Sequence, residues 1–347
     1  MNYPSNKIGE RGLNKMHYLG FLNTSIRSCN QGDYIIVESV KRELKNCLTS
    51  SFVIELPTHS PVMRPGEFGF RPERNSDYLA LKNMEYAFLC GTNLLAGEIT
   101  SKWNQWNLQE DDLVVLDDKV IAVGVGSAPG FDSLSRRATK LYSSVFSSEY
   151  IHSARDERTK NLLESCGLRA LNTGCATMWM LTESHCARIP HLKADSVVVT
   201  LTDYKKDPVH DSQLIELLLD LYDDVYFWIQ GIGDLSYIES LGFSDKVKLV
   251  APNLEAYNAL LDSIDCDFVG TRLHAGIKAM QKKKRSIILG VDNRSFDIAQ
   301  TYGINYVPRD DIDAVRNMVT EPLETHVGIN ETVIDEFLSQ FGGLSIA

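Results

Sequence analysis

The heptapeptide GTRLHAG at residues 270–276 holds the side chains with the clearest chemical potential in this sequence. Residues 267–270 are predicted as a strand and residues 272–281 as a helix, so Arg272 and His274 would lie in the first helical turn. Backbone N–H groups and the helix dipole favour an anion there. Arg272 could grip a carboxylate or phosphate with two N–H groups, and a protonated His274 could donate a proton. The alternative is a surface arginine beside a packed histidine.

A second arginine, Arg155, has a similar setting in the first half of the chain. It follows a predicted strand, residues 150–154, and precedes a predicted helix, residues 156–166. The acidic side chains of Asp156 and Glu157 suit the start of a helix for dipole reasons alone. Arg155 has no such explanation, so it is a candidate anion-binding residue. A solvated arginine at a strand edge is the alternative.

The sequence NQGD at residues 30–33 opens the first long predicted helix, residues 33–47. Asn30 and Gly32 would lie where the preceding loop meets a ligand, and a glycine lets a ligand approach the backbone closely. Asp33 has two interpretations. It caps the helix, or its carboxylate faces the ligand and accepts a proton from a substrate hydroxyl group.

Small and polar residues follow two further predicted strands of the first half. Gly91 and Asn93 come after the strand at residues 86–89, and Gly126 comes after the strand at residues 120–125. The carboxyl ends of parallel strands share one edge of a sheet, which is where ligands bind in α/β folds. We therefore expect these three residues to line the same binding region.

Short β-branched or aromatic runs alternate with helical patterns along the whole chain. This alternation predicts an α/β fold with mostly parallel sheets. We expect two Rossmann-like domains, residues 1–189 and residues 190–347, the second including a C-terminal helix. The carboxyl ends of both sheets would face a shared cleft. The expected strands are residues 18–23, 51–54, 86–89, 120–125, 150–154, 197–201, 225–229, 247–250, 268–270, 286–290 and 306–307. The expected helices are residues 33–47, 132–145, 156–166, 212–222, 235–241, 254–264, 272–281, 311–319 and 331–341.

Composition narrows the possible partners. The 347 residues carry 35 basic and 46 acidic side chains, a net charge of −11. An acidic surface disfavours nucleic acid and anionic membranes as general partners, so an anionic substrate would need a local basic pocket. The basic run at residues 281–285 ends the GTRLHAG helix and is expected to be a solvated face, with contact to an anionic lipid or a partner as the alternative.

Compartment and metal content follow from smaller features. The seven cysteines are odd in number and scattered, which is typical of reduced thiols. The first 21 residues lack the apolar stretch of a signal peptide, and no apolar run is long enough to span a membrane. We therefore expect a cytoplasmic protein without a transmembrane segment. No spacing of histidines and cysteines predicts a metal site.

Taken in order, the motifs resemble those of the polysaccharide pyruvyl transferase family. They are NQGD at residues 30–33, GTNLL at residues 91–95, Arg155-Asp156 with its helix, and GTRLHA at residues 270–275. The resemblance spans about residues 20 to 307 and is strongest in the last motif. The family usually has a run of glycines at residues 90–92 and often an Asp-Pro near residues 173–175, where this chain has CGT and TGC.

The resemblance implies a glycosyltransferase-B-like architecture and a transfer of the pyruvyl group of phosphoenolpyruvate to a sugar. The acceptor would be a cell-surface polysaccharide or its precursor, free or lipid-linked, and phosphate would be released. A lipid-linked acceptor would require transient membrane contact. The first domain would hold the acceptor and the second the donor. No cofactor or metal is expected, because cationic side chains can neutralise the donor.

The resemblance also implies roles for the candidate residues. The donor would be bound by Arg155, Arg272 and Leu273, with His274 as general acid and Asp33 as candidate general base. The acceptor or the cleft would be lined by Asn30, Gly32, Gly91, Asn93 and Gly126.

Two other functions remain open from the sequence. One is a glycosyltransferase of the same architecture that uses a nucleotide-sugar donor, with its diphosphate at the start of the GTRLHAG helix. The other is a non-catalytic binding protein of this fold.

Overall fold

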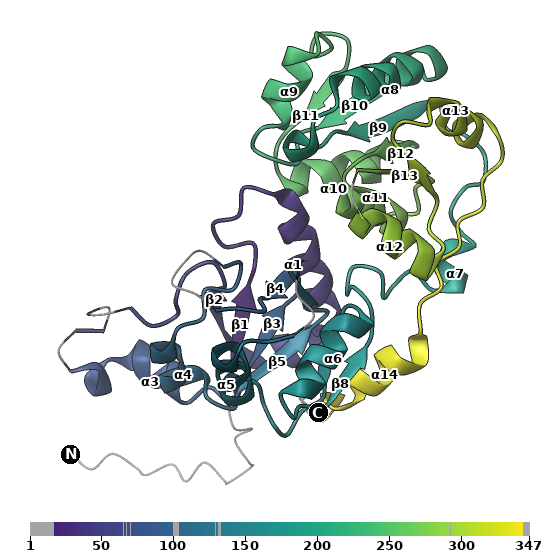
Figure 1. Ribbon diagram of the computed structural model, residues 1–347. Coiled ribbons are helices and arrows are strands. Elements are labelled where there is room, and N and C mark those ends of the chain that lie inside the picture. Colours follow the sequence, from purple (N-terminus) through teal and green to yellow (C-terminus); the bar gives the residue numbers. More distant parts are fainter. Residues whose placement is uncertain are drawn as a thin grey trace, which may run out of the picture.

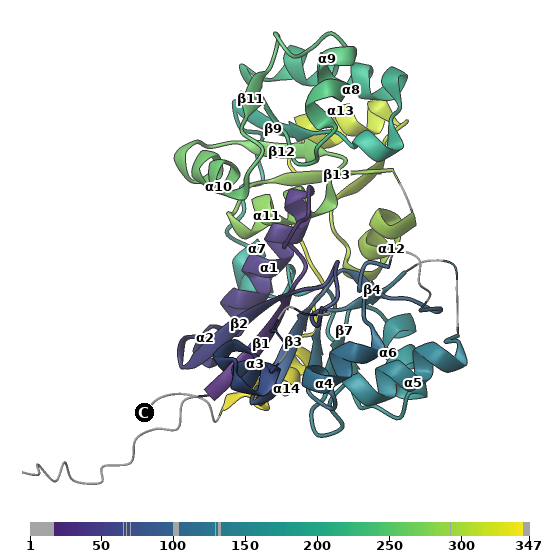
Figure 2. The ribbon, with the colours of Figure 1, turned by 90° about the vertical axis from the view of Figure 1, so that its left-hand side faces the viewer.

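The computed structural model describes residues 17–342, except residues 65, 67, 70, 100–103, 129, 131–132 and 292 and the side chains of residues 293–295 and 297. The chain forms two α/β domains, one above the other in Figure 1 and seen from the side in Figure 2. Each is built on parallel strands, so the expected two-domain α/β architecture is confirmed.

The second domain has a six-stranded sheet in the order β11-β10-β9-β12-β13-β14, and all its neighbouring strands are parallel. This is the Rossmann order, in which ligands bind where the winding reverses, here between β9 and β12. Its strands are β9 (Ser196–Thr200), β10 (Asp224–Trp228), β11 (Lys248–Val250), β12 (Asp267–Gly270), β13 (Ser286–Gly290) and β14 (Tyr306–Pro308). Its helices are α8 (Pro208–Leu221), α9 (Asp234–Ser240), α10 (Leu254–Ser263), α11 (Leu273–Gln281), α12 (Asn293–Tyr302) and α13 (Ile312–Thr320), with a 3-10 turn at Asp203–Lys205.

The first domain has a parallel sheet in the order β2-β1-β3-β5, which the pair β7-β8 continues through a bridge from Val125 to Ala154. Its strands are β1 (His17–Asn23), β2 (Ser51–Pro57), β3 (Tyr86–Cys90), β4 (Asn93–Leu95), β5 (Val120–Val123), β6 (Gly126–Ser127), β7 (His152–Ala154) and β8 (Ala170–Asn172). Its helices are α1 (Gln31–Glu43), α2 (Lys45–Thr49), α3 (Ser76–Lys82), α4 (Leu113–Leu116), α5 (Arg136–Val145) and α6 (Glu157–Ser165), with 3-10 turns at Pro72–Arg74 and Glu110–Asp112.

Most expected elements are present with shifted ends. The expected helix at residues 33–47 is divided at Leu44 into α1 and α2. The expected helix at residues 132–145 begins later as α5, because the Ser135 hydroxyl accepts the N–H of Ala138 and caps the helix there. None of the helices in the described part of the chain is both long enough and apolar enough to cross a membrane.

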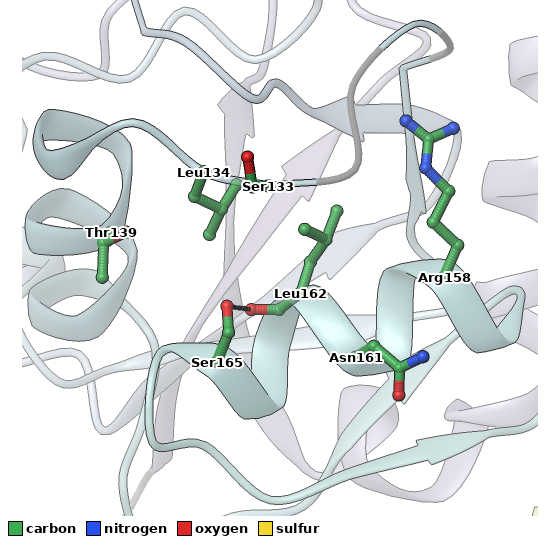
Figure 3. A pocket seen from close by; sticks show the side chains of 7 residues that line it. All are labelled: Ser133, Leu134, Thr139, Arg158, Asn161, Leu162 and Ser165. Atoms are coloured by element: carbon green, nitrogen blue, oxygen red, sulfur yellow. Dashed lines mark hydrogen bonds between the residues drawn. The ribbon is translucent and has the colours of Figure 1, made fainter.

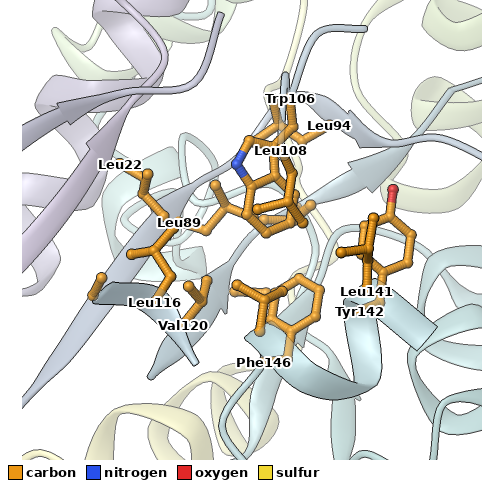
Figure 4. Close-up of a cluster of buried hydrophobic side chains, with 14 of the residues drawn as sticks. Leu22, Leu89, Leu94, Trp106, Leu108, Leu116, Val120, Leu141, Tyr142 and Phe146 are labelled. Carbon is orange, nitrogen blue, oxygen red and sulfur yellow. The ribbon is translucent and has the colours of Figure 1, made fainter. Parts of the chain in front are cut away.

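Aromatic side chains fill the core on one face of the first sheet (Figure 4). Trp106 stacks on Tyr142 with ring centroids 6.0 Å apart, and Phe146 meets Trp106 edge to face. This packing holds α5 against the sheet beside β5. The strand ends that carry the candidate residues are therefore fixed by a dense core.

The C-terminal helix covers the opposite face of the first sheet. In Figure 1, α14 (Glu331–Ser339) lies beside β8, whereas α13 lies at the top of the second domain. Phe337 and Phe341 are buried in the cluster that contains Phe88, and the rings of Phe88 and Phe341 lie 5.1 Å apart. The expectation that this helix belongs to the second domain is therefore wrong.

The first domain also ends earlier than expected. Cys175, Met178 and Ile189 pack in the core of the second domain, and His185 Nε2 lies 2.9 Å from the carbonyl oxygen of Met280. Trp179, in the same segment, packs in the first domain instead. The chain thus crosses between the domains from residue 173 onward, and again between α13 and α14.

Helix α1 joins the two domains along its length. Glu38 forms an ion pair with the buried Lys278 of α11 and accepts a 3.0 Å hydrogen bond from Asn258 of α10. One turn further along α11, the side-chain amide nitrogen of Gln281 donates to Ser39 Oγ of α1 at 3.2 Å. The domains therefore contact each other through polar side chains that have partners on both sides.

The basic run after α11 is only in part the solvated face that the sequence indicated. Lys283 is exposed and Lys282 and Lys284 are half-buried, whereas the last residue of the run is buried. Arg285 is 1% exposed and donates to the carbonyl oxygens of Met318, Val319 and Glu321 at the end of α13. Its Nε lies 3.3 Å from Asp267 Oδ2. This arginine is a core residue that neutralises a helix C-terminus and a buried carboxylate.

A buried histidine links β5 to β7, the strand that precedes Arg155. His152 Nδ1 accepts the N–H of Ala122 at 3.2 Å, and Nε2 lies 3.0 Å from the carbonyl oxygen of Ser147. Burial lowers the pKa of His152 from 6.5 to about 4, so the folded protein keeps this ring neutral. The unfolded chain takes up the proton below pH 6.5, so stability is lost as the pH falls from 6.5 to 4.

We expect His152→Gln to reduce the loss of unfolding free energy between pH 7 and pH 4 by about 3 kcal/mol relative to wild type. Urea unfolding at a series of pH values measures this difference. The exposed His326, changed to Gln, is the control for the loss of a histidine at the surface. An unchanged slope in His152→Gln would contradict the assignment of a neutral buried ring.

Candidate functional site

Three residues predicted separately form one cluster at the edge of the first sheet. Arg155 Nη2 donates to Asn93 Oδ1 at 2.5 Å, and its side chain is 12% exposed. A Cβ on Gly126 would lie 2.4 Å from Arg155 Cζ, so only glycine leaves room for the guanidinium. Asp156 Oδ2 lies 3.6 Å from the same Nη2. Arg155 is therefore a positioned cation at the start of α6 and not a solvated one.

Gly91 allows two backbone segments to approach each other closely at this edge of the sheet. A Cβ on Gly91 would lie 2.1 Å from the carbonyl oxygen of Gly124. The chain leaving β3 thus passes directly against the chain leaving β5. This close approach leads β4 alongside β6 and so brings Asn93 to Arg155.

The start of α1 lies at the contact between the domains. Asn30 caps the helix by accepting the N–H of Gly32 at 3.1 Å, and it also accepts a 3.0 Å hydrogen bond from Gln230 Nε2. The N–H of Gln31 donates to the carbonyl oxygen of Gln230 at 2.9 Å. Asn30 and Gln31 therefore hold the first domain to the loop after β10, and Gly32 leaves room for Gln230, whose Nε2 would lie 3.1 Å from a Cβ at this position.

Asp33 is not the cap of α1, because Asn30 has that place. Its Oδ2 accepts a 2.5 Å hydrogen bond from Ser28 Oγ, and the residue is half-buried. The carboxylate thus lies at the switch point of the first sheet, where the loop after β1 turns into α1.

Arg272 is buried at the switch point of the second sheet, with 5% of its side chain exposed. It has the N-cap position of α11, and its Nε donates to the carbonyl oxygen of Leu201 at 3.0 Å. Its Nη2 donates to Asp203 Oδ1 at 2.8 Å and also to Asp234 Oδ1. The exposed ring of Tyr204 lies 5.3 Å from the guanidinium carbon. The alternative of a surface arginine is wrong for this residue.

The loop after β10 completes this ion cluster. Asp234 is fully buried, and its second oxygen accepts the N–H groups of Gln230 at 3.1 Å and Gly231 at 2.7 Å. Asp203 Oδ2 accepts the N–H of Gly233 at 3.1 Å. Burial raises the pKa of Asp234, and the neighbouring Arg272 acts in the opposite direction. The carboxylates and the arginine are thus held by backbone as well as by each other.

His274 meets the segment that crosses between the domains. Its Nε2 lies 3.9 Å from Cys175 Sγ, and that sulfur also accepts a 3.1 Å hydrogen bond from Thr177 Oγ1. The ring is half-buried, whereas the side chain of Leu273 is buried in the core of the second domain. His274 is therefore placed between the two domains, and Leu273 could face a ligand only with its backbone.

Tyr302, at the end of α12, lies beside the segment that crosses between the domains. A Cβ on Gly174 would lie 2.6 Å from Tyr302 Oη, which puts the hydroxyl beside the crossing segment. The pKa of Tyr302 is raised to about 12, mainly by burial and also by Cys175 and Asp156, while Arg155 acts in the opposite direction. Tyr302 thus lies within electrostatic range of both Arg155 and the neighbour of His274.

Sequence reasoning missed Tyr302 and the carboxylates around Arg272. An aspartate three residues after the end of β9 and the Gly-x-Gly pattern after β10 could have drawn attention to Asp203 and to the loop before Asp234. Nothing in the local sequence marks Tyr302. Within the described part of the chain, no group of three histidine, cysteine, aspartate or glutamate side chains is arranged to hold a metal ion.

A pocket of about 630 Å³ with both polar and apolar lining lies on the first domain between α5 and α6 (Figure 3). Leu134 and Leu162 point toward each other at its floor, with hydroxyl and amide side chains and Arg158 around them. Arg158 Nη2 donates to the carbonyl oxygen of Ala128 at 3.1 Å, just after β6. The pocket is lined by Ser133, Leu134, Thr139, Arg158, Asn161, Leu162 and Ser165.

Comparison with known proteins gives a family and several structural neighbours. The sequence profile of polysaccharide pyruvyl transferases matches residues 30–293. No curated protein sequence matches the chain.

Solved structures with a similar fold share little sequence with it. UDP-GlcNAc 2-epimerase of Methanocaldococcus jannaschii is 15% identical with a TM-score of 0.48, covering 94% of this chain and 100% of its own. The wall teichoic acid polymerase TagF is 10% identical with a TM-score of 0.40, covering 94% and 82%. UDP-GlcNAc 2-epimerase of Neisseria meningitidis is 13% identical with a TM-score of 0.37, covering 93% and 98%.

We expect Asp234→Ala to lower the free energy of unfolding by about 3 kcal/mol, because it removes one partner of a buried ion pair and orphans two backbone N–H groups. Urea unfolding followed by circular dichroism measures this loss. Asp265, exposed and 3.8 Å from Lys284, offers a matched control whose change to Ala should cost less than about 1 kcal/mol. Equal effects of the two substitutions would show that the Arg272 cluster contributes little to stability.

Proposed function

Because this chain belongs to the polysaccharide pyruvyl transferase family, we propose that it transfers the pyruvyl group of phosphoenolpyruvate to a sugar of a cell-surface polysaccharide or its precursor and releases phosphate. The observation that supports this most is the pair of hydrogen-bonded arginines, one from each domain, at the starts of α6 and α11. His274 lies two residues beyond the second arginine, at the contact between the domains.

The charges of the donor fit this arrangement. Phosphoenolpyruvate carries a carboxylate and a phosphate on a three-carbon frame, so a clamp needs two cations on opposite sides. Arg155 and Arg272 supply one each, and the first turns of α6 and α11 add backbone N–H groups. Arginine is suited to both groups because its planar fork matches their oxygen pairs.

The chemistry assigned to His274 is proton donation to the methylene carbon of the donor. That carbon becomes a methyl group, C2 becomes electrophilic, and a sugar hydroxyl forms a bond to C2. A second hydroxyl of the sugar then bonds to C2 as the C2–O bond to phosphate breaks. Of the two hydroxyl protons, one replaces the proton that His274 gave and the other leaves with phosphate. Arginine and helix N–H groups stabilise the charge that develops on the phosphate.

Asp33 is the residue we assign to accept a proton from the attacking hydroxyl. Ser28 Oγ donates to one of its oxygens and so orients the carboxylate at the switch point of the first sheet. A carboxylate in this setting is a suitable hydrogen-bond acceptor for a sugar.

The acceptor saccharide is assigned to the first domain. The pocket between α5 and α6 combines leucine side chains, which suit the C–H face of a sugar, with hydroxyl and amide groups that suit its edges. Arg155 packs on Gly126 and Arg158 donates to Ala128, two residues further along the same extended chain, or about 7 Å. A saccharide in this pocket would therefore end close to the donor arginine.

We expect His274→Gln to bind phosphoenolpyruvate like wild type but to lose about 100-fold or more in turnover, because only the proton donor is removed. Arg155→Ala should instead weaken donor binding by about tenfold or more. Calorimetry with phosphoenolpyruvate and phosphate release in the presence of a saccharide acceptor measure the two effects.

The same titrations with nucleotide sugars form the comparison. Binding of nucleotide sugars without binding of phosphoenolpyruvate would favour a glycosyltransferase and contradict the proposed donor. Wild-type binding and pyruvylation in both arginine and histidine variants would favour a non-catalytic role for this site.

A subtler substitution tests the position of Arg155 while keeping its charge. In Gly126→Ala the new Cβ would meet Arg155 Cζ at 2.4 Å, so the flexible arginine must move while the backbone stays in place. We expect weaker binding of phosphoenolpyruvate, by about tenfold, with little change in melting temperature. Gly342→Ala, where a Cβ would contact nothing within 4 Å, is the control. Unchanged affinity in Gly126→Ala would argue against a donor contact at Arg155.

A further inference from the structure

The Nε and Nη2 groups of Arg272 are bonded to other groups of the protein. Its Nη2 is shared by Asp203 and Asp234, its Nε is bonded to the carbonyl oxygen of Leu201, and only 5% of the side chain is exposed. The ring of Tyr204 covers it on another side. A donor anion can form a two-nitrogen contact that includes Nη2 only if one of these partners leaves.

The two carboxylates differ in how firmly they are held. Asp234 is fully buried, begins α9 and accepts two backbone N–H groups besides the arginine. Asp203 is 22% exposed, lies in the 3-10 turn Asp203–Lys205 and accepts one backbone N–H, that of Gly233. Water can replace the contacts of Asp203 as it moves out, whereas Asp234 would lose its contacts inside the core. Asp203 is therefore the partner that can exchange.

The charges around Arg272 favour replacement of one carboxylate by the donor anion over simple addition of the anion. When both carboxylates are ionised, the cluster holds one positive and two negative charges, so an added anion meets net repulsion. If the donor takes the place of Asp203 on Arg272, the number of negative groups around the guanidinium stays the same. The backbone bonds to Asp234 keep the arginine oriented meanwhile.

We infer that Asp203 is a positioning residue that holds Arg272 until the donor displaces it, so that the second domain selects an anion strong enough to replace a carboxylate. This inference rests on the proposed function, because phosphoenolpyruvate is the anion that would take the place of Asp203. Tyr204 follows Asp203 in the same turn, so its ring moves off the guanidinium in the same step.

The test is calorimetric titration of the full chain with phosphoenolpyruvate. Asp203→Asn keeps an oxygen for the N–H of Gly233 but removes the competing charge, so we expect it to bind the donor about fivefold to tenfold more tightly than wild type. A purely structural role would weaken binding instead. Asp207→Asn is the matched control, since it removes one charge four residues away, still caps α8 and has no contact with Arg272; its affinity should equal that of wild type.

Hydrogen exchange of the wild-type protein gives a second readout that needs no variant. Saturation with phosphoenolpyruvate should increase exchange of the N–H of Gly233, whose acceptor is Asp203, while the N–H groups of Gln230 and Gly231, which Asp234 accepts, stay protected. Equal or weaker donor binding by Asp203→Asn, or unchanged exchange of the Gly233 N–H when the donor binds, would overturn the inference and leave the proposed donor standing. Absence of phosphoenolpyruvate binding by wild type and Asp203→Asn alike would overturn both.

Discussion

The pairing of Arg272 with Asp203 and Asp234 is the interaction on which the architecture around the candidate site depends. It joins the ends of β9 and β12, the residue that begins α9 and the residue that caps α11. The loop that supplies Asp234 is the same loop that accepts α1 of the first domain, through Gln230 and Asn30. One buried ion cluster therefore sets the geometry of the second sheet's edge and of the contact between the domains. A charge buried this deeply is costly unless its partners are fixed, which explains why backbone N–H groups complete the cluster.

The alternation of strands and helices was sufficient to predict the two-domain α/β fold, because each strand of a parallel sheet is a short apolar run with helices on either side of it in the sequence. The expectation failed where local pattern and tertiary packing differ. Helix α14 is an ordinary amphipathic helix in sequence, and only the aromatic cluster around Phe88 shows which domain it covers. Arg285 belongs to a basic run, yet the carbonyl groups at the end of α13, distant in sequence, draw it into the core.

Some residues of the candidate site could likewise be predicted from the sequence and others could not. Arg155, Arg272 and His274 could be found from the sequence because each lies where a strand gives way to a helix, and such junctions share one edge of a parallel sheet. The residues that pair with them could not be predicted in this way, because contacts between segments distant in the sequence produce no local pattern. Tyr302 ends a helix and reaches the site through a contact with Gly174 that only the folded chain creates.

The two crossings between the domains affect how the protein can be divided. A fragment ending at residue 189 would lack α14, so the apolar face around Phe88 would be exposed to water, while Cys175, Met178 and Ile189 would be stripped of the core in which they pack. The first domain is therefore not a continuous piece of chain. Its sheet can be covered only after α14 has been synthesised, and α14 follows the whole second domain in the sequence. A nascent first domain would therefore present an open apolar surface until α14 is made, and its completion is tied to that of the second.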